Sequence, residues 1–297
     1  MFEIESAAMR FFRRFGCDGI AWSLRRLHCP VRAEDLVLEV GSGGNPYARA
    51  NVLLDAYEVT RQRHWVPLKS DRPTVIGFVE HLPFRDKVFD FIIASHVLEH
   101  SADPARFLEE LQRVGRAGYI EVPDAVMERL IPYSDHRLEI TERGGQLLIR
   151  KKQGPVVDQE LAELYESRVS PLIGGRLIPQ RPFDFHVRFY WKDRIDFQVV
   201  NPAVDAAWSA KESEGMSIPT VRSGIPLIKE RLLNGCRLLL SQRRRNRDLP
   251  LLKLLRCPSC TAESLSSAEN ALTCAQCGMR YPIRNGIPVL YPREMNV

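Results

Sequence analysis

Two pairs of cysteines in the C-terminal part of the chain have the spacing of a metal site. Cys257 and Cys260 form one Cys-x-x-Cys pair, Cys274 and Cys277 form a second, and 13 residues separate the pairs. Four thiolates at this spacing can close a tetrahedral Zn²⁺ site, from which a small domain draws much of its folding free energy. Because four cysteines leave no open coordination position, we expect a structural zinc ion. A metal-free relic and redox-active pairs are the alternatives.

A glycine-rich turn in the segment LVLEVGSGGNP, which begins at Leu36, is a second candidate site. Glycine permits positive φ and lets a ligand approach the backbone, although many nucleotide-binding folds share such a turn. The next predicted strand ends at Asp55, 14 residues after Gly41, whereas a dinucleotide fold places its ribose-binding acid about 20 residues on. Residues 45–50 hold no more than about one turn of helix.

The short connection bears on the kind of ligand. A pyrophosphate would use the N-terminus of the missing helix, whereas S-adenosylmethionine (SAM) carries no phosphate. Acidic groups such as Glu39 and Asp55 suit the amino group, the sulfonium and the ribose of SAM. The pattern therefore favours SAM over NAD, and a structural turn with nothing bound is the alternative.

Polar side chains that could act on a substrate follow the fourth and fifth predicted strands. His96, Glu99 and His100 lie in SHVLEH, and Asp124 ends GYIEVPD. Parallel α/β sheets bind ligands at this edge. Methyl transfer from a sulfonium requires orientation above all, and a general base only where the acceptor is protonated. We take His96, Glu99 and Asp124 as catalytic candidates, with capping, solvated or packing roles as the alternatives.

The elements that must position these residues alternate between strand and helix. Asp103-Pro104 predicts the start of a helix over 104–114, and the alternation predicts a parallel sheet with covering helices. Apolar runs predict strands at 36–40, 51–55, 74–78, 89–94 and 118–122.

The middle of the chain is less regular. The segment HRLEITERGGQLLIRKK predicts a β-hairpin that turns at Gly144-Gly145, and FHVRFYWKDRIDFQVV predicts one or two further strands. His136 and His186 in this region could enter a substrate pocket, or could simply pack. A helix is expected over 227–241.

We therefore expect an α/β protein with a Rossmann-like sheet, a β-rich insertion and a small zinc-ribbon-like domain. The expected parts are an N-terminal helical segment at 1–30, a SAM-binding core at 31–124, a substrate-side insertion with remaining core strands at 125–228, a helix and basic linker at 229–249, and a zinc domain at 250–297.

The net charge of +5 over 297 residues is local. Nine basic and two acidic residues between Lys229 and Arg256 give +7, so the remainder sums to about −2. The run Arg243–Arg247 could be a solvated hinge, an RNA contact or a contact to an anionic membrane surface.

We expect no transmembrane segment and no secretory signal. An odd cysteine count fits a reducing cytoplasm.

Residues 35–123 resemble a class I SAM-dependent methyltransferase of the type 11 group. The matching stretches are LVLEVGSGGNP, NVLLDAYE, FVEHLPFRDKVFDFIIASHVLEH and DPARFLEELQRVGRAGYIEVPD. The resemblance implies that the loop holds the methionine part of SAM, Asp55 the ribose and three residues the adenine, and that Ser95 and His96 close the pocket. The implied loop residues are Glu39, Gly41, Ser42, Gly43 and Asn45, and the implied adenine neighbours are Glu80, His81 and Leu82. The family's usual acid two positions before Glu80 is Phe78 here.

The last 47 residues, with LLKLLRCPSC and LTCAQCGMRYPIRNGIPVL, resemble the zinc-domain family of tRNA-methyltransferase activator subunits and their short bacterial relatives. The eukaryotic members bind and stabilise class I methyltransferases and cover an apolar face. The resemblance implies a built-in activator that contacts the methyltransferase core. We expect a methyltransferase whose acceptor is a small molecule, an RNA or a protein. The rival is a catalytically silent scaffold that acts through its zinc module.

Overall fold

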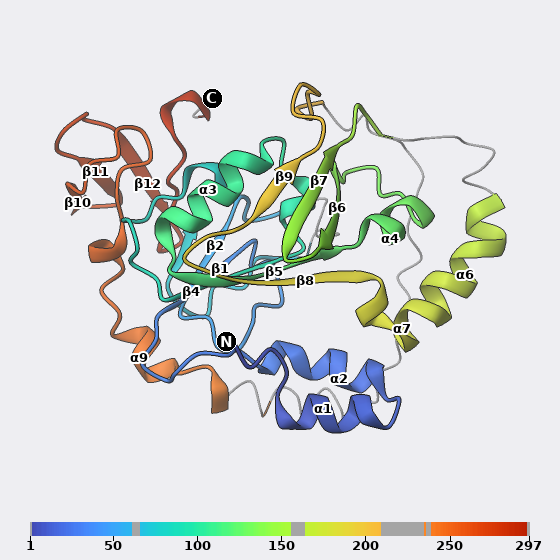
Figure 1. Cartoon of the computed structure of the whole chain (residues 1–297). Coiled ribbons are helices and arrows are strands. Elements are labelled where there is room, and N and C mark those ends of the chain that lie inside the picture. Colours follow the sequence, from blue (N-terminus) through green and yellow to red (C-terminus); the bar gives the residue numbers. More distant parts are fainter. Residues whose placement is uncertain (1, 61–65, 156–163, 209–234, 236–238, 296–297) are drawn as a thin grey trace.

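The computed structural model describes residues 2–60, 66–155, 164–208, 235 and 239–295 (Figure 1). Its centre is a six-stranded sheet in which five strands run parallel and the last, β8, runs antiparallel to β5. The strand order is β3 (Thr74–Ile76), β2 (Val52–Asp55), β1 (Val37–Val40), β4 (Phe91–Ser95), β5 (Ala117–Pro123) and β8 (His186–Lys192). The predicted strands and the α/β class are confirmed. The prediction succeeds because short, continuous apolar runs are typical of parallel strands that are buried on both faces.

The prediction of covering helices is confirmed only in part. Among the described residues, α3 (Pro104–Val114) is the one α-helix between two of the parallel strands, and the Asp103 side chain caps it through the Arg106 amide at 3.0 Å. Its residues Phe107 and Leu111 pack on one face of the sheet. The other face packs against the loop after β1 and against residues 2–31, which contain α1 (Ala7–Arg14) and α2 (Asp18–Leu24).

The insertion supplies a second, three-stranded sheet. β6 (Leu138–Arg143) and β7 (Gln146–Lys151) form the predicted hairpin, and β9 (Phe197–Val199) joins β7 in parallel. Buried residues of the hairpin pack on the same face as α3, where they extend the main core. The short helix α4 (Ala125–Leu130) contacts β6, whereas α6 (Ser170–Leu172) and α7 (Ile178–Gln180) lie away from the hairpin, on the side of α2 (Figure 1).

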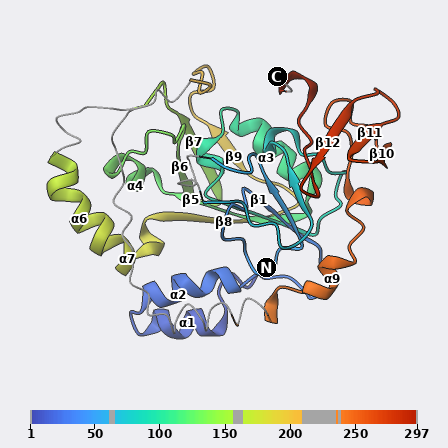
Figure 2. The ribbon, with the colours of Figure 1, turned by 180° about the vertical axis from the view of Figure 1, so that it is seen from behind.

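The C-terminal module is a four-stranded antiparallel sheet that lies at one side of the molecule, beside α9 (Figure 2). It docks on the outer edge of β3, where Val289 forms a parallel bridge with Ile76. The Leu290 amide donates to the Ile76 carbonyl at 2.8 Å, and Leu255 forms a bridge with Phe84. Tyr281 and Leu290 belong to the same buried cluster as the main sheet. The two parts therefore share one core. The module's strands are β10 (Leu265–Ala268), β11 (Ala271–Cys274), β12 (Arg280–Arg284) and β13 (Ile287–Pro288).

The basic run is a short helix, α9 (Arg243–Arg247), and not an extended hinge. The buried Asn246 accepts a hydrogen bond from the Asn51 side-chain amide at 2.7 Å, just before β2. Arg245 donates to main-chain carbonyls before β1, including that of Ala33 at 2.7 Å. The predicted helix over 227–241 lies mostly outside the described residues. No helix in the described ranges is long and apolar enough to cross a membrane.

Candidate functional site

The glycine turn after β1 lies where a small ligand would meet the carboxyl edge of the parallel strands. Gly41 and Gly43 have φ of +64° and +57°, a conformation that glycine adopts without strain. A Cβ at Gly41 would stand 2.0 Å from Cγ2 of Val97. The Gly43 amide donates to Oδ2 of Asp55 at 2.9 Å, which ties the turn to the end of β2. The structure thus brings together the two features that the sequence singles out.

Two polar groups under the turn are suited to a cationic ligand. Glu39 is buried in β1, accepts a hydrogen bond from the Tyr47 amide at 2.7 Å, and has a pKa raised by burial to about 8. The buried Ser42 hydroxyl has no hydrogen-bond partner among the described residues. The donor set therefore fits the amino acid and sulfonium of SAM. Asn45 is exposed, and its carbonyl accepts from Arg26 at 2.7 Å.

A neighbouring segment lies over the same turn. The Lys69 amide donates to the Gly43 carbonyl at 3.0 Å, and Val66 lies so close to Gly44 that a Cβ there would be 2.5 Å from its side chain. Residues 66–69 therefore form an outer wall of the turn.

The residues expected around adenine lie after β3, but most of their polar groups are engaged. Glu80 accepts from the Ser101 hydroxyl at 2.5 Å, and the buried Leu82 donates its amide to Glu110 at 2.8 Å. The His81 amide donates to the Phe78 carbonyl at 3.2 Å.

Phe78, which replaces the usual acid, lies between two aromatic rings. Its centroid is 5.8 Å from that of Tyr57 and 5.0 Å from that of Tyr291 in the zinc module. The Tyr291 hydroxyl donates to the Ala56 carbonyl at 2.6 Å, next to Asp55. The module therefore contributes a side chain to the nucleoside end of the candidate site, which the sequence pattern did not indicate.

On the acceptor side, His96 lies between two buried carboxylates. Its Nδ1 is 3.4 Å from Glu99 Oε1 and its Nε2 is 3.4 Å from Glu121 Oε1. Burial by itself lowers the pKa of His96, but the two carboxylates outweigh burial and raise it to about 9. Burial opposes ionisation of Glu99 too, yet His96 holds its pKa at about 2. At neutral pH this arrangement favours an imidazolium between two carboxylates.

Glu121 and Arg25 are the residues of this cluster that sequence reasoning missed. Arg25 binds both oxygens of Glu121, which is fully buried and also accepts from the hydroxyls of Ser95 and Tyr119. His96 and Arg25 together hold the pKa of Glu121 well below its usual range, although burial opposes its ionisation. The available signal was an acid in the middle of the apolar strand GYIEVPD, because such a group needs a buried partner.

Other candidates have local roles. Both oxygens of Asp124 are engaged, because it caps α4 through the Val126 amide at 2.8 Å and accepts from the Thr141 hydroxyl at 2.6 Å. His186 lies against Trp22 with ring centroids 4.6 Å apart, and burial lowers its pKa to about 4. The structure therefore brings His96 together with Glu99 and with the His186 ring, whose centroid is 5.5 Å from that of His96, whereas Asp124 serves α4 and Thr141.

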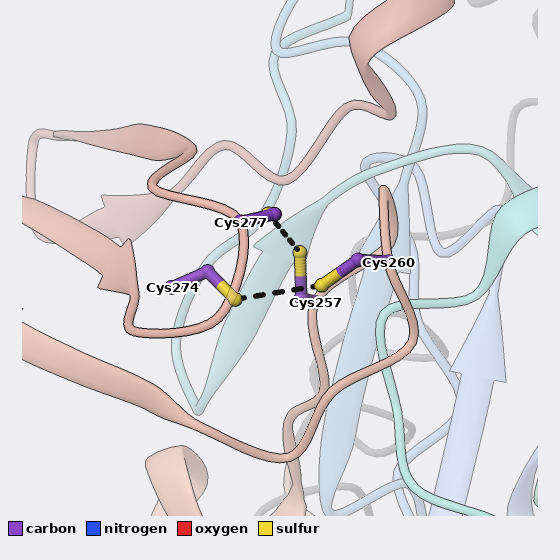
Figure 3. Close-up of side chains that lie close together, drawn as sticks. All are labelled: Cys257, Cys260, Cys274 and Cys277. Carbon is purple, nitrogen blue, oxygen red and sulfur yellow. Dashed lines mark hydrogen bonds between the residues drawn. The ribbon is translucent and has the colours of Figure 1, made fainter.

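The four cysteines of the C-terminal module converge (Figure 3). The Sγ atoms of Cys257 and Cys277 are 3.7 Å apart, and those of Cys260 and Cys274 are 3.5 Å apart. Tetrahedral zinc with Zn–S bonds of about 2.3 Å places its sulfurs about 3.8 Å apart, so the cluster fits the ion. The four thiols come from the turn after Leu255, from the last residue of β11 and from the β11–β12 connection.

Comparisons with known proteins match the two parts separately. Residues 38–120 match the model of a methyltransferase domain, and residues 248–286 match that of Trm112p-like proteins. A tRNA U34 carboxymethyltransferase of Nautilia profundicola is 28% identical over 132 residues, which cover 41% of this chain and 42% of that protein. An uncharacterized protein of Methanocaldococcus jannaschii is 30% identical over 81 residues, which cover 27% of this chain and 40% of that protein. The chain therefore spans less than half the length of each of these two relatives.

The C-terminal part matches one relative over most of that relative's length. A UPF0434 protein of Serratia proteamaculans is 44% identical over 48 residues, which are 16% of this chain and 80% of that protein. Among solved structures, a complex between the Haloferax volcanii Trm112 methyltransferase activator and a methyltransferase matches at 18% identity with a TM-score of 0.38. The match covers 65% of this chain and 99% of that one.

The fold and these matches define a class I SAM-dependent methyltransferase domain joined to a small cysteine-rich module. Through that module the chain belongs to the Trm112p-like family. The expected combination of the two is confirmed.

Proposed function

We propose that the protein transfers a methyl group from SAM to an acceptor at the carboxyl edge of its parallel sheet. One observation carries the proposal: the Gly43 amide and the Asp55 carboxylate meet at 2.9 Å within the segment that matches methyltransferase domains. In this arrangement the glycine turn and the ribose-binding acid of the sequence prediction form one site. When bound, SAM supplies an activated methyl group on a neutral leaving group.

The chain's own residues divide the work of holding SAM. Asp55 accepts from the ribose hydroxyls, Glu39 and the Ser42 hydroxyl face the methionine part, and Phe78, Tyr57 and Tyr291 wall the nucleoside end. A cation beside Glu39 favours the ionised carboxylate, which burial alone disfavours.

On the acceptor side, His96 and Glu99 orient the acceptor. Their charges are fixed by partners on β5 and in the N-terminal segment, so they need no reorganisation during the reaction. This proposal gives Asp124 no role in the reaction; it caps α4 and accepts from the Thr141 hydroxyl.

The zinc module, in this proposal, stabilises the methyltransferase domain by pairing the exposed edge of β3. An unpaired edge strand leaves backbone donors and acceptors unsatisfied and invites aggregation. The contacts of Leu290 with Ile76, of Leu255 with Phe84 and of Tyr291 with Ala56 support this role.

RNA is a more specific candidate for the methyl acceptor. A tRNA-modifying relative and the exposed Arg243, Arg244 and Arg247 on α9 favour it. However, α9 lies beside residues that precede β1 and β2, at the opposite edge of the sheet from the glycine turn. Only an acceptor large enough to span the domain would reach both places. RNA affinity should fall steeply with salt and should weaken when the three arginines become glutamine, whereas a small acceptor should respond to neither.

Calorimetry with SAM and with its demethylated product tests the main proposal. We expect micromolar binding that Asp55→Asn weakens at least tenfold, whereas Glu109→Ala on the exposed face of α3 leaves it unchanged. Thermal unfolding of each variant separates loss of binding from loss of fold. No binding at millimolar SAM by a folded protein would overturn the proposal in favour of the silent scaffold.

A further inference from the structure

A second group of metal-ligating side chains lies beside the acceptor side of the candidate site. One donor atom from each of Glu99, His100 and His136 lies within 4.8 Å of the other two. Two imidazoles and one carboxylate form a ligand set that binds divalent transition metals with coordination positions left open. This set is separate from the four cysteines and is chemically different, because it has no sulfur donor.

The fold, and not chance proximity of long side chains, brings these residues together. Glu99 and His100 lie in a 3-10 turn that follows β4, and His136 lies two residues before the start of β6. The Arg137 amide donates to the Glu99 carbonyl at 2.7 Å, so the main chains of the two segments are joined at this point. His136 and Glu99 are 7% and 2% exposed, which leaves their side chains little freedom.

Each histidine is oriented by a contact at its Nδ1. His136 Nδ1 lies 2.6 Å from Glu128 Oε2, and His100 Nδ1 lies 3.3 Å from the Asp135 carbonyl. These acceptors favour the tautomer with the proton on Nδ1, which leaves Nε2 of each ring as a metal-binding lone pair. Ligating histidines usually donate their other ring nitrogen to a carboxylate or a carbonyl in this way. Glu128 is itself held by Lys152 and by the Tyr133 amide.

The carboxylate of Glu99 gives an independent sign that a ligand is needed. Neither of its oxygens has a hydrogen-bond partner among the described residues, although both are buried. His96 is at ion-pair distance, 3.4 Å from one oxygen, without hydrogen-bond geometry. Buried carboxylate oxygens without hydrogen bonds are costly, and a divalent cation satisfies them.

We propose that Glu99, His100 and His136 bind a divalent transition metal ion, with Glu128 as the residue that positions His136. Manganese, iron, cobalt and zinc all suit two imidazole nitrogens and one carboxylate oxygen. His100 is partly exposed, so the site is not closed off from solvent. That an acceptor oxygen completes the coordination rests on the proposed function, whereas the binding of the ion does not.

Manganese binding measured by electron paramagnetic resonance tests the site. Mn²⁺ prefers nitrogen and oxygen donors to thiolates, so zinc in the four-cysteine site does not interfere. We expect the zinc-loaded full chain, without SAM, to bind one Mn²⁺ per chain. Glu99→Gln and His136→Ala should each weaken binding at least tenfold, and Glu128→Gln should weaken it 10- to 100-fold. His28→Ala is the matched control, since His28 contacts the Glu3 carbonyl and is not part of the cluster.

Cobalt gives a second readout that does not depend on affinity. Co²⁺ in the cysteine site should show intense thiolate charge-transfer bands, and a second equivalent should add only weaker bands that vanish in His136→Ala. Absence of Mn²⁺ binding at millimolar metal, or equal binding by the wild type and a folded Glu99→Gln variant, would overturn the proposal. Because SAM is not present, failure here leaves the cofactor calorimetry to decide the proposed function separately.

Discussion

Arg25 and Glu121, 96 residues apart in the chain, form a bidentate ion pair in the interior. Arg25 Nε donates to Glu121 Oε2 at 2.7 Å and Arg25 Nη2 donates to Oε1 at 2.8 Å. Arg25 is 8% exposed and Glu121 is not exposed at all. The Arg25 guanidinium also lies over the Trp22 ring, 3.6 Å from its centroid. The pair thus fastens the N-terminal segment to β5 directly beside His96, so this segment belongs to the candidate site and not to a separate appendage.

Removal of the arginine should therefore destabilise the protein strongly. Arg25→Ala leaves a buried carboxylate without its main counter-charge, and breaking one partner of a buried pair costs about 3–5 kcal/mol. Denaturant unfolding measures the loss. The matched control is Arg10→Ala, which breaks an exposed pair with Glu3 and should leave the free energy of unfolding unchanged. If Arg25→Ala lowers the free energy of unfolding no more than Arg10→Ala does, the buried pair contributes no more to stability than the exposed one.

The sequence predicts the local parts of this fold well. Continuous apolar runs identify the five parallel strands, Asp103-Pro104 identifies the start of α3, and Gly144-Gly145 identifies the hairpin, because each signal depends only on neighbouring residues. The glycine turn and Asp55 are also found, since both follow directly from strand ends.

The nonlocal pairings could not be predicted in the same way. Nothing in the order of residues says that Arg25 meets Glu121, that Leu290 extends the sheet at Ile76, or that His136 lies beside Glu99. Covering helices were expected from strand alternation alone, whereas α3 shares the cover with the N-terminal segment and the hairpin. Sequence patterns report which face of an element is apolar, but not which distant segment covers it.

The docking of α9 predicts how the linker responds to protease. Asn246→Ala removes a buried amide that bonds Asn51 at 2.7 Å and the Ser241 carbonyl at 2.8 Å. Because Asn51 loses a buried partner, we expect a loss of about 1–3 kcal/mol in local stability. Trypsin should then cleave after Arg245 at least several-fold faster, as followed by mass spectrometry. Asp248→Ala, an exposed neighbour, is the control. An unchanged cleavage rate would mean that the helix is already released in solution.

Burial of Glu39 should make the free energy of unfolding depend on pH, and the isosteric change Glu39→Gln should remove this dependence. Its pKa is about 8 in the folded protein against an ordinary value of 4.5, so the folded state binds the proton more tightly than the unfolded state. The free energy of unfolding therefore falls, through this group, as the pH rises from about 4.5 to about 8. Glu39→Gln lacks this term and can still accept from the Tyr47 amide. The stability of the variant relative to the wild type should increase across that window, measured by denaturant unfolding at four pH values.

The same carboxyl should couple SAM binding to proton release. A cationic ligand beside Glu39 lowers its pKa, so the wild type should release a fraction of a proton on binding at pH 7 and should bind more tightly as the pH rises towards 8. Calorimetry in two buffers of different ionisation enthalpy counts the proton. Glu39→Gln should release none, and a wild type that behaves like this variant would place the cation elsewhere.

Removal of zinc should weaken the methyltransferase domain and not only the module. The module's own core is small, so loss of the metal should unfold it. Leu290 would then leave the Ile76 carbonyl, and β3 would become a free edge. We expect chelation, or Cys257→Ser, to abolish amide protection at Leu290 first and then at Thr74–Ile76 in hydrogen exchange. Amides of β5, which is paired on both sides by β4 and β8, should stay protected and serve as the internal control. If the amides of β3 stay protected after zinc is lost, the module does not stabilise the methyltransferase domain and has a separate role. A module that stabilises β3 must lower the protection of β3 when it unfolds.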